Sequence, residues 1–361
     1  MKIINLILFI LSNLFFFSNN NVNIKYKEVY FSQNCLMLIY CKKEYSLNVF
    51  KIALLTIAKM ENKYIREFVE HYFFIGVNKI IIYDNNEING EKMDEILDDY
   101  IKSNFITIHN FRGIKNGQRR AYNEMYQKYR FEYDYVMFFD VDEFLILNQY
   151  KNIHYFLRDK KYSKCDVIHI QWVLYDDNDL VHYDNRPLNI RFTRPNFHIF
   201  IDNLLVKSIF KTYKNVRFKI SHTPIAKHLF KCDINGNKND KYLPKRNIAI
   251  ESNLTVPYIK HFQYKTVEEF FLKLVRGDVF YSTDPLKIIT KKRFFTINKW
   301  TQEKENIANE IIKNYKKIQK TQETKKEKDS KEENEKSEPE KKSAIREIME
   351  LIMKIIMRIR F

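Results

Sequence analysis

The chain has 361 residues, of which 45% are hydrophobic and 15% aromatic, enough apolar material for one sizeable packed core. This composition excludes a disordered chain. The formal net charge of +17 is spread along the whole sequence, without zinc-finger spacing, a base-stacking aromatic signature or a basic region before heptads. We therefore expect no nucleic-acid partner, because a basic surface suits nucleotide sugars or anionic lipid equally well.

The N-terminus predicts entry into the secretory pathway. Residues 3–17 form a nearly unbroken apolar run, right for a signal-peptide core and short for a spanning helix, which needs roughly 20 residues. No Ala-x-Ala cleavage site follows, so we favour an uncleaved signal anchor within residues 1–20, with a cleaved signal peptide as the alternative. Both alternatives place the rest of the chain in the oxidising lumen of the secretory pathway, with residues 21–49 as a luminal stem.

Four cysteines and one sequon fit that compartment. The cysteines allow three complete pairings, among which the sequence does not choose; one of them joins Cys35 to Cys41 and Cys165 to Cys232. The sequon at Asn253 predicts a glycoprotein.

From residue 50 onward, apolar runs alternate between strand and helix periodicity. This alternation predicts an α/β fold with a mostly parallel sheet covered by helices. Denser strand-like alternation between residues 165 and 230 predicts a β-rich part, and we place the globular domain at residues 50–300. The predicted strands are 51–58, 79–83, 105–109 and 135–139, and the predicted helices are 61–76, 91–101 and 117–129.

The C-terminal part of the chain contains three further predicted segments. Thr266 and Glu269 form a capping box, which predicts a helix that ends near Gly277. Residues 301–343 are dense in Lys and Glu and predict a charged linker that is either disordered or a solvated helix. Residues 344–361 predict an amphipathic helix that lies on a membrane or a partner, or docks back on the body.

Carboxylates follow two of the predicted strands. Asp140 and Asp142 come directly after residues 135–139, and Asp84 follows residues 79–83. Ligands bind beyond the carboxyl ends of the strands in such sheets, so these side chains should face one crevice. Asp140 and Asp142 point to the same side of an extended segment and suit Mg²⁺ or Mn²⁺ bridged to phosphates. A solvated loop is the alternative for this pair.

Two more residues are candidates for the same crevice, each with a structural alternative. Asp84 suits a hydrogen bond to a nucleoside, although its Asp-Asn-Asn setting also favours a plain turn. His261 stands at a predicted strand end, where a neutral imidazole can supply a third metal ligand. A lone histidine is more often structural, and spacing alone does not decide between the two.

The chain contains, in order, the Glu-Asn-x-x-Ile-x-Glu-x-x-x-His pattern from Glu61, Tyr83-Asp84-Asn85, Gln118-x-x-Ala121-Tyr122, Phe139 to Phe144, Trp172, His222-Thr223-Pro224 and His261 to Gly277. This ordered set resembles glycosyltransferase family 92 and the related family-2-like transferases. The resemblance implies a GT-A fold, Rossmann-like with a β-rich acceptor side, a UDP-sugar donor and a divalent metal ion, Mn²⁺ with Mg²⁺ as the alternative. It also implies an inverting hexosyltransferase, with galactose as the expected sugar and a glycan hydroxyl as acceptor.

The resemblance also implies roles for individual residues. Asp140 and Asp142 would hold metal and diphosphate, and His261 would be a later metal or phosphate contact. Asp84 would face the nucleoside. The remaining predicted contacts to the donor are Asn85, Gln118, Lys265 and Arg276.

The favoured candidate for the catalytic base lies in the loop after Trp172, where the chain departs from the family pattern. Family members often carry a glycine-containing loop after Trp172, whereas this chain reads Val-Leu-Tyr-Asp-Asp-Asn-Asp, which leaves the acceptor open. An inverting transfer needs a carboxylate to take the proton of the acceptor hydroxyl. Asp176, Asp177 and Asp278 are the candidates, and we favour Asp177.

The leading hypothesis is a type II Golgi membrane glycosyltransferase with a luminal catalytic domain. The competing hypothesis is a catalytically silent, membrane-associated binding protein of the same fold, suggested by the terminal amphipathic helix and the altered loop. The presence of Asp140, Asp142 and His261 argues against it. A metal-dependent phosphotransferase is less favoured, because the chain has no Gly-x-x-x-x-Gly-Lys loop.

Overall fold

The computed structural model separates the chain into two units, residues 1–50 and 51–361, and each is described by itself. The predicted anchor at 1–20, the sequon residue Asn253 and the predicted helix at 344–361 lie outside the described residues. Among the residues described, no helix combines the length and the apolar character that crossing a membrane requires. The structure describes residues 25–31, 37–42, 50–197, 205–212, 216–219, 223–226, 228–239, 254–276, 291–314 and 317.

The first unit contains a small antiparallel sheet within the predicted stem. Its strands are β1 (Lys25–Phe31) and β2 (Met37–Lys42), which pair with a register shift between Tyr26 and Val29.

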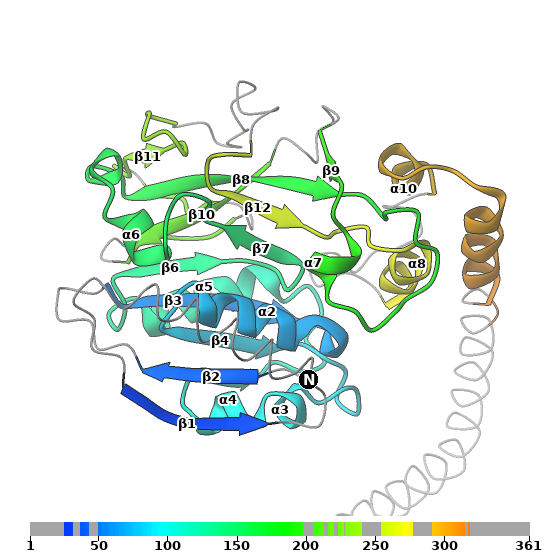
Figure 1. Ribbon diagram of the computed structural model, residues 1–361, viewed down its shortest axis with the longest axis horizontal. Helices are drawn as coiled ribbons and strands as arrows, with labels where there is room; N and C mark the ends of the chain where they lie inside the picture. Colours follow the sequence, from blue (N-terminus) through cyan, green and yellow to red (C-terminus); the bar gives the residue numbers. More distant parts are fainter. Residues whose placement is uncertain are drawn as a thin grey trace, which may run out of the picture. The chain divides into compact units, whose positions relative to one another are not determined.

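The second unit is built on one mixed sheet, and the first half of this sheet is parallel (Figure 1). Its four strands lie in the spatial order β5-β4-β3-β6, so the first strand in the sequence lies in the middle. Every residue of β3 and β6 is buried, which explains why both strands are unbroken apolar runs. The strands are β3 (Ile52–Ala58), β4 (Lys79–Asp84), β5 (Ile106–Asn110) and β6 (Tyr135–Phe138).

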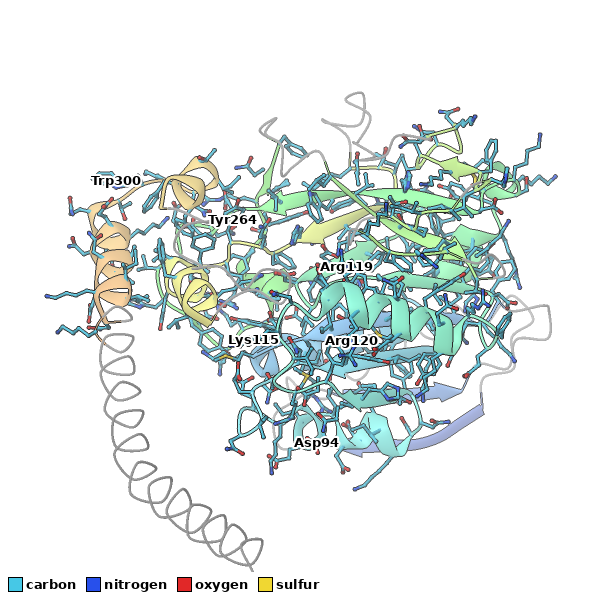
Figure 2. The ribbon with its side chains drawn as sticks, turned by 180° about the vertical axis from the view of Figure 1, so that it is seen from behind. Asp94, Lys115, Arg119, Arg120, Tyr264 and Trp300 are labelled. Carbon is cyan, nitrogen blue, oxygen red and sulfur yellow. A yellow bond between two sulfur atoms is a disulfide. The ribbon has the colours of Figure 1, made fainter. Side chains whose placement is uncertain are left out.

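Helices cover both faces of this parallel half. Helix α2 (Asn62–Phe74) lies in front of the sheet in Figure 1, and α5 (Gln118–Tyr129) comes to the front in the reversed view of Figure 2. Each helix buries one apolar face, with Ile65, Phe68 and Val69 on α2 and Ala121 and Met125 on α5. The predicted α/β architecture is therefore confirmed for this half.

The helix predicted over residues 91–101 is broken in two. Its parts are α3 (Met93–Ile96) and α4 (Asp98–Lys102), and Leu97 between them has φ −110°, outside helical geometry. The carbonyl of Ile96 accepts a 2.7 Å hydrogen bond from the Arg66 guanidinium on α2. The Ile96 carbonyl thus has a hydrogen-bond donor from another helix in place of an amide of its own helix. The apolar periodicity of residues 91–101 alone does not reveal this break.

The second half of the sheet continues from β6 in the order β10-β8-β12-β7. Strand β10 runs antiparallel to both β6 and β8 and so joins the two halves, while β8 and β12 are parallel. This part confirms the predicted β-rich region. Its strands are β7 (Glu143–Ile146), β8 (Val167–Tyr175), β9 (Pro195–Asn196), β10 (Val206–Lys211), β11 (Lys231–Cys232) and β12 (Tyr258–His261), and its short helices are α6 (Ile153–Leu157), η1 (Lys160–Tyr162) and α7 (Leu188–Arg191).

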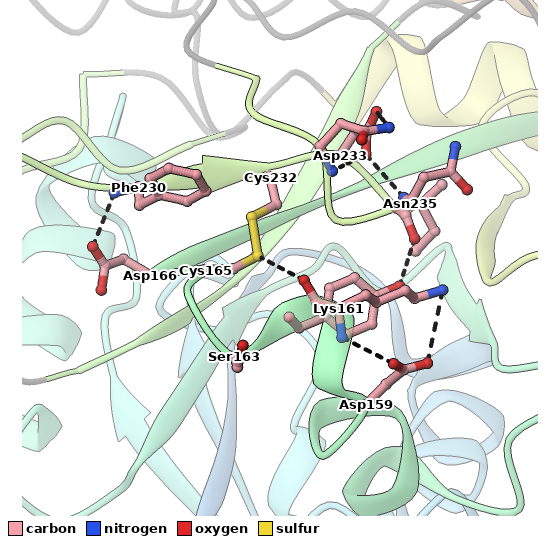
Figure 3. Close-up of a disulfide and its surroundings, with 12 residues drawn as sticks. Asp159, Lys161, Ser163, Cys165, Asp166, Phe230, Cys232, Asp233 and Asn235 are labelled. Carbon is pink, nitrogen blue, oxygen red and sulfur yellow. Dashed lines mark hydrogen bonds and ion pairs between the residues drawn. A yellow bond between two sulfur atoms is a disulfide. The ribbon is translucent and has the colours of Figure 1, made fainter.

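A disulfide fastens the outer edge of this region (Figure 3). Cys165 and Cys232 are bonded with their Cα atoms 5.7 Å apart, which ties the start of β8 to β11 across 67 residues. Beside it, the Asp166 carboxylate accepts a 2.9 Å hydrogen bond from the Phe230 amide. This pairing is one of those left open by the sequence, and Cys35 lies outside the described residues.

The C-terminal helices pack on the β-rich side. Helix α8 (Val267–Arg276) begins with the predicted capping box, since the Glu269 amide donates to Thr266 Oγ1 at 3.2 Å and the Thr266 amide donates to Glu269 Oε2 at 3.3 Å. Tyr264, labelled in Figure 2, belongs to an apolar cluster shared by α8 and α10 (Lys291–Ile297).

The predicted linker boundary at residue 301 is too early. Residues 302–314 are helical, and Ala308 of this helix is fully buried against the cluster around Tyr264. The partly buried Ile307, Ile311 and Ile312 give the helix an apolar face, which the density of Lys and Glu over the longer window obscured.

His71 links α2 to β7, and its burial predicts a pH-dependent stability. Its Nε2 lies 2.9 Å from the Leu145 carbonyl, and burial lowers its pKa from 6.5 to about 4. A lowered folded-state pKa stabilises the fold above pH 6.5, and this contribution is lost as the pH falls toward 4. We expect a loss of about 2–3 kcal/mol over this window. His71→Gln should flatten that part of the stability–pH curve in urea unfolding, and an unchanged slope would contradict the assignment.

Candidate active site

The crevice of the sheet opens where the strand order reverses. Counting along the chain, β5-β4-β3-β6 is third, second, first and fourth, so the connections run in opposite directions on either side of β3 and β6. Ala58, the last residue of β3, pairs with Asp84 at the end of β4. Asp140 follows β6 by two residues. The fold therefore places the predicted carboxylates at the edge where such sheets bind ligands.

Asp140 is held by neighbours on both of its oxygens. Oδ1 accepts hydrogen bonds from the Tyr122 hydroxyl at 3.1 Å and from Gln118 Nε2 at 3.4 Å, both on α5. Oδ2 accepts from Lys207 Nζ on β10 at 2.8 Å. Gln118, which was predicted to contact the nucleotide-sugar donor, thus contacts Asp140 directly. These hydrogen bonds fix the orientation of the Asp140 carboxylate.

Asp142 is deeper and faces the last part of the domain. Its side chain is 5% exposed, and Oδ2 lies 2.5 Å from Lys273 Nζ and 3.7 Å from Lys265 Nζ. Burial alone would raise the pKa of Asp142, but these two ammonium groups outweigh it and hold that pKa well below its usual range. Asp142 is therefore a carboxylate anion at neutral pH.

A buried lysine and glutamate complete this cluster. Lys207 is fully buried and also lies 3.2 Å from Glu143 Oε2, which in turn accepts from the Asp140 amide at 3.1 Å. Burial would lower the pKa of Lys207, but Asp140 and Glu143 raise it, so the ammonium stays charged. Neither residue was among the predicted site residues. The available signal was Lys207 near the start of the strand Val206–Lys211, where a buried charge needs a partner.

His261 ends β12 and faces both carboxylates of this strand end. Its Nε2 lies 3.6 Å from Asp142 Oδ1 and 3.9 Å from Glu143 Oε1, and its ring packs on Trp172 with centroids 4.4 Å apart. Burial lowers the pKa of His261, so the imidazole is neutral at pH 7. Sequence and structure therefore agree in bringing His261 to Asp142.

The predicted three-ligand metal centre is not assembled in this arrangement. Among the described residues, no three His, Cys, Asp or Glu side chains converge as ligands of one ion. The physical reason is the lysines, because Lys207 occupies Asp140 and Lys273 occupies Asp142. Asp142 and the neutral His261 nevertheless fit a divalent ion, since a carboxylate and an imidazole are ligands that Mn²⁺ accepts. The 3.6 Å between their nearest atoms leaves an ion room between them.

The predicted nucleoside contacts are ordered by an arginine. Asp84 is 4% exposed, and its Oδ2 accepts from Arg112 Nε at 2.8 Å. Arg112 also donates to the Glu91 carbonyl at 2.7 Å and so fixes the loop that follows β4. Asn85 donates its amide hydrogens to the carbonyls of Phe111 and Ile114 at 2.9 and 2.8 Å. Both predicted residues are thus buried and held in place at the carboxyl end of β4.

The predicted base, Asp177, is engaged elsewhere. It is fully buried, its Oδ2 lies 2.5 Å from Lys304 Nζ, and its amide donates to Asn298 Oδ1 at 2.8 Å. Burial raises the pKa of Asp177, and Lys304 opposes that shift. The alternative Asp176 accepts from Arg194 Nε at 3.0 Å. Asp278 lies outside the described residues.

The helix that carries the distal lysine is firmly anchored. The Glu269 carboxylate on α8 accepts hydrogen bonds from both terminal nitrogens of Arg191, at 2.8 and 2.9 Å, and from the Tyr64 hydroxyl at 2.7 Å. The Arg191 side chain is 1% exposed. Lys265, just before α8, is 3% exposed and lies over the Tyr64 ring at 4.5 Å. Arg276 is the last residue of α8, and its side chain lies outside what the structure describes.

Comparison with solved structures finds matches at low similarity. The mannosyltransferase PcManGT from Pyrobaculum calidifontis, solved with GDP-Man and Mn²⁺, is 10% identical with a TM-score of 0.26, over 36% of this chain and 39% of that one. S. aureus TarS 1–349, solved with UDP-GlcNAc, is 12% identical with a TM-score of 0.36, over 73% of this chain and 80% of that one. No curated protein matches the sequence.

The family comparison is more direct. The model of glycosyltransferase family 92 matches residues 54–232. This range contains Asp84, Asp140, Asp142 and Lys207, and the later contacts to these carboxylates come from the segment that follows it. Over residues 54–232 this chain is similar to glycosyltransferase family 92, and the protein is a glycosyltransferase.

Proposed function

We propose that this glycosyltransferase is metal-dependent and moves a hexose, with galactose as the first candidate, from a UDP-sugar to a glycan hydroxyl with inversion. The observation that carries the proposal is the meeting of Asp142 and neutral His261, 3.6 Å apart, beside Asp140 at the strand-order reversal. Lysines adjoin both aspartates, which gives the crevice the cations that a diphosphate needs.

Each residue has a distinct task in this proposal. Asp142 and His261 would hold the ion, and Asp140 can join them because its Oδ2 keeps a second lone pair beside Lys207. A bound divalent ion would neutralise the charge that develops on the UDP leaving group. Lys265 and Lys273 would contact the diphosphate, and Asp84 with Arg112 would border the nucleoside.

The acceptor side is proposed on the loop after β8. Asp177 stays the proposed base, and it has to part from Lys304 before an acceptor hydroxyl can reach it. The disulfide between Cys165 and Cys232 fits the oxidising compartment predicted from the N-terminus.

A thermal-shift panel of UDP-sugars with and without Mn²⁺ tests this proposal, followed by donor hydrolysis for each sugar that binds. We expect UDP-galactose with Mn²⁺ to raise the melting temperature more than either component alone, because only ligands that bind the folded state stabilise it. UDP-GlcNAc, UDP-glucose and GDP-mannose provide the comparison. The proposal fails if no UDP-sugar with Mn²⁺ shifts the melting temperature and none is hydrolysed.

A further inference from the structure

The ion pair between Lys273 and Asp142 joins two very different side chains. Asp142 is 5% exposed, whereas Lys273 is 34% exposed, and their charged atoms are 2.5 Å apart. The lysine comes from α8, 131 residues further along the chain. A side chain with one third of its surface in water can swing away without unpacking the core, whereas the carboxylate cannot leave.

The other two lysines of the cluster do not have this freedom. Lys207 is fully buried between Asp140 and Glu143, and Lys265 is 3% exposed and packed over Tyr64. Helix α8 itself is fixed through the Glu269–Arg191 pair. Of the two lysines beside Asp142, Lys273 is therefore the one whose ammonium group can move.

A metal ion and the Lys273 ammonium compete for the same carboxylate. Lys273 lies on Oδ2 and His261 faces Oδ1, so an ion bound by Asp142 and His261 would come within a few ångströms of the ammonium. Like charges at such a separation repel strongly in a buried site. A diphosphate brought in with the ion would offer Lys273 an anionic partner in place of Asp142.

We propose that Lys273 exchanges partners as the donor binds: it neutralises Asp142 before a metal ion arrives, and it transfers to a diphosphate oxygen when the ion takes Asp142. This exchange rests on the proposed function and makes Lys273 the residue that couples the two ligands. Each ligand then strengthens the binding of the other, because one removes the repulsion and the other removes the competitor.

Opposite changes in two affinities test the exchange. Free Mn²⁺ is counted by electron paramagnetic resonance without nucleotide, and UDP affinity is measured by calorimetry at saturating Mn²⁺. We expect Lys273→Met to tighten Mn²⁺ binding about ten-fold, because its competitor is gone, and to weaken UDP binding about ten-fold. Lys273→Arg should stay close to wild type in both measurements.

Lys102→Met is the matched control, because it removes an exposed lysine 2.5 Å from Asp98 on α4 and should change neither affinity. Weaker binding of both ligands in Lys273→Met would overturn the exchange, since a merely structural lysine gives that result. An unchanged Mn²⁺ affinity with Mn²⁺–UDP binding intact would overturn the exchange alone. Absence of Mn²⁺ and UDP binding in the wild-type protein would overturn the proposed function as well.

Discussion

Asp142→Asn is expected to reduce donor turnover by at least about 100-fold, the usual effect of removing one electrostatic contact from a transition state. Asn keeps the shape of the side chain and removes the charge that would hold the metal ion. It also removes the negative charge that lies 2.5 Å from Lys273 and 3.7 Å from Lys265. The two ammonium groups would then repel an incoming cation, so the affinity for Mn²⁺ should fall together with turnover.

The measurement is UDP release from the donor sugar, with Mn²⁺ affinity determined on the same preparation. Asp98→Asn is the control, since this aspartate also lies 2.5 Å from a lysine but is 56% exposed and belongs to α4. A thermal melt of each variant checks that it is folded. Turnover and Mn²⁺ affinity within two-fold of wild type would show that Asp142 does not bind the ion.

Lys207→Met is expected to lower the free energy of unfolding by about 3–5 kcal/mol, the usual cost of removing one partner from a buried ion pair. Glu143 is fully buried, and its carboxylate would lose the ammonium that lies 3.2 Å away. Burial raises the pKa of Glu143 well above its usual range and Lys207 opposes this shift, so loss of the ammonium makes a charged Glu143 still less favourable. Methionine fills most of the space of the lysine stem, so the loss reflects charge more than packing.

Urea unfolding of the single variant and of Lys207→Met combined with Glu143→Gln measures this effect. The double variant should recover a large part of the stability, because a neutral glutamine needs no counter-ion. Lys102→Met again serves as control, with an expected loss below about 1 kcal/mol for an exposed pair. Equal stability of the single and double variants would mean that the charge of Glu143 is not what Lys207 compensates.

The parallel half of the fold could be predicted because its signals are local. Strands β3, β4 and β6 are short, mostly apolar runs, and the strand-end rule places Asp84 and Asp140 at one edge from the order of the elements alone. The break at Leu97 was missed because it depends on Arg66, which comes from another helix. Local periodicity contains no information about such a contact.

The lysines of the site could not be predicted because their partners are distant in the sequence. Lys207 and Lys273 lie 67 and 131 residues from the carboxylates that they contact. Asp177 was chosen as a base for its position after β8, and only the packing of residues 302–314 shows that Lys304 meets it. A charge pattern gives the sign of a residue, whereas the fold decides which opposite charge it meets.

The position of β10 between β6 and β8 also has a consequence for synthesis on the ribosome. Strands β3 to β6 emerge before β10 and can pair with one another. Until β10 is made, however, one edge of β6 has no partner strand, and all the side chains of β6 are apolar. Lys207 lies on β10, 67 residues after Asp140. The strand that pairs with the free edge of β6 therefore also brings the ammonium group that pairs with Asp140. The nascent chain is most prone to aggregate during that interval, and chaperones that shield sheet edges should matter most there.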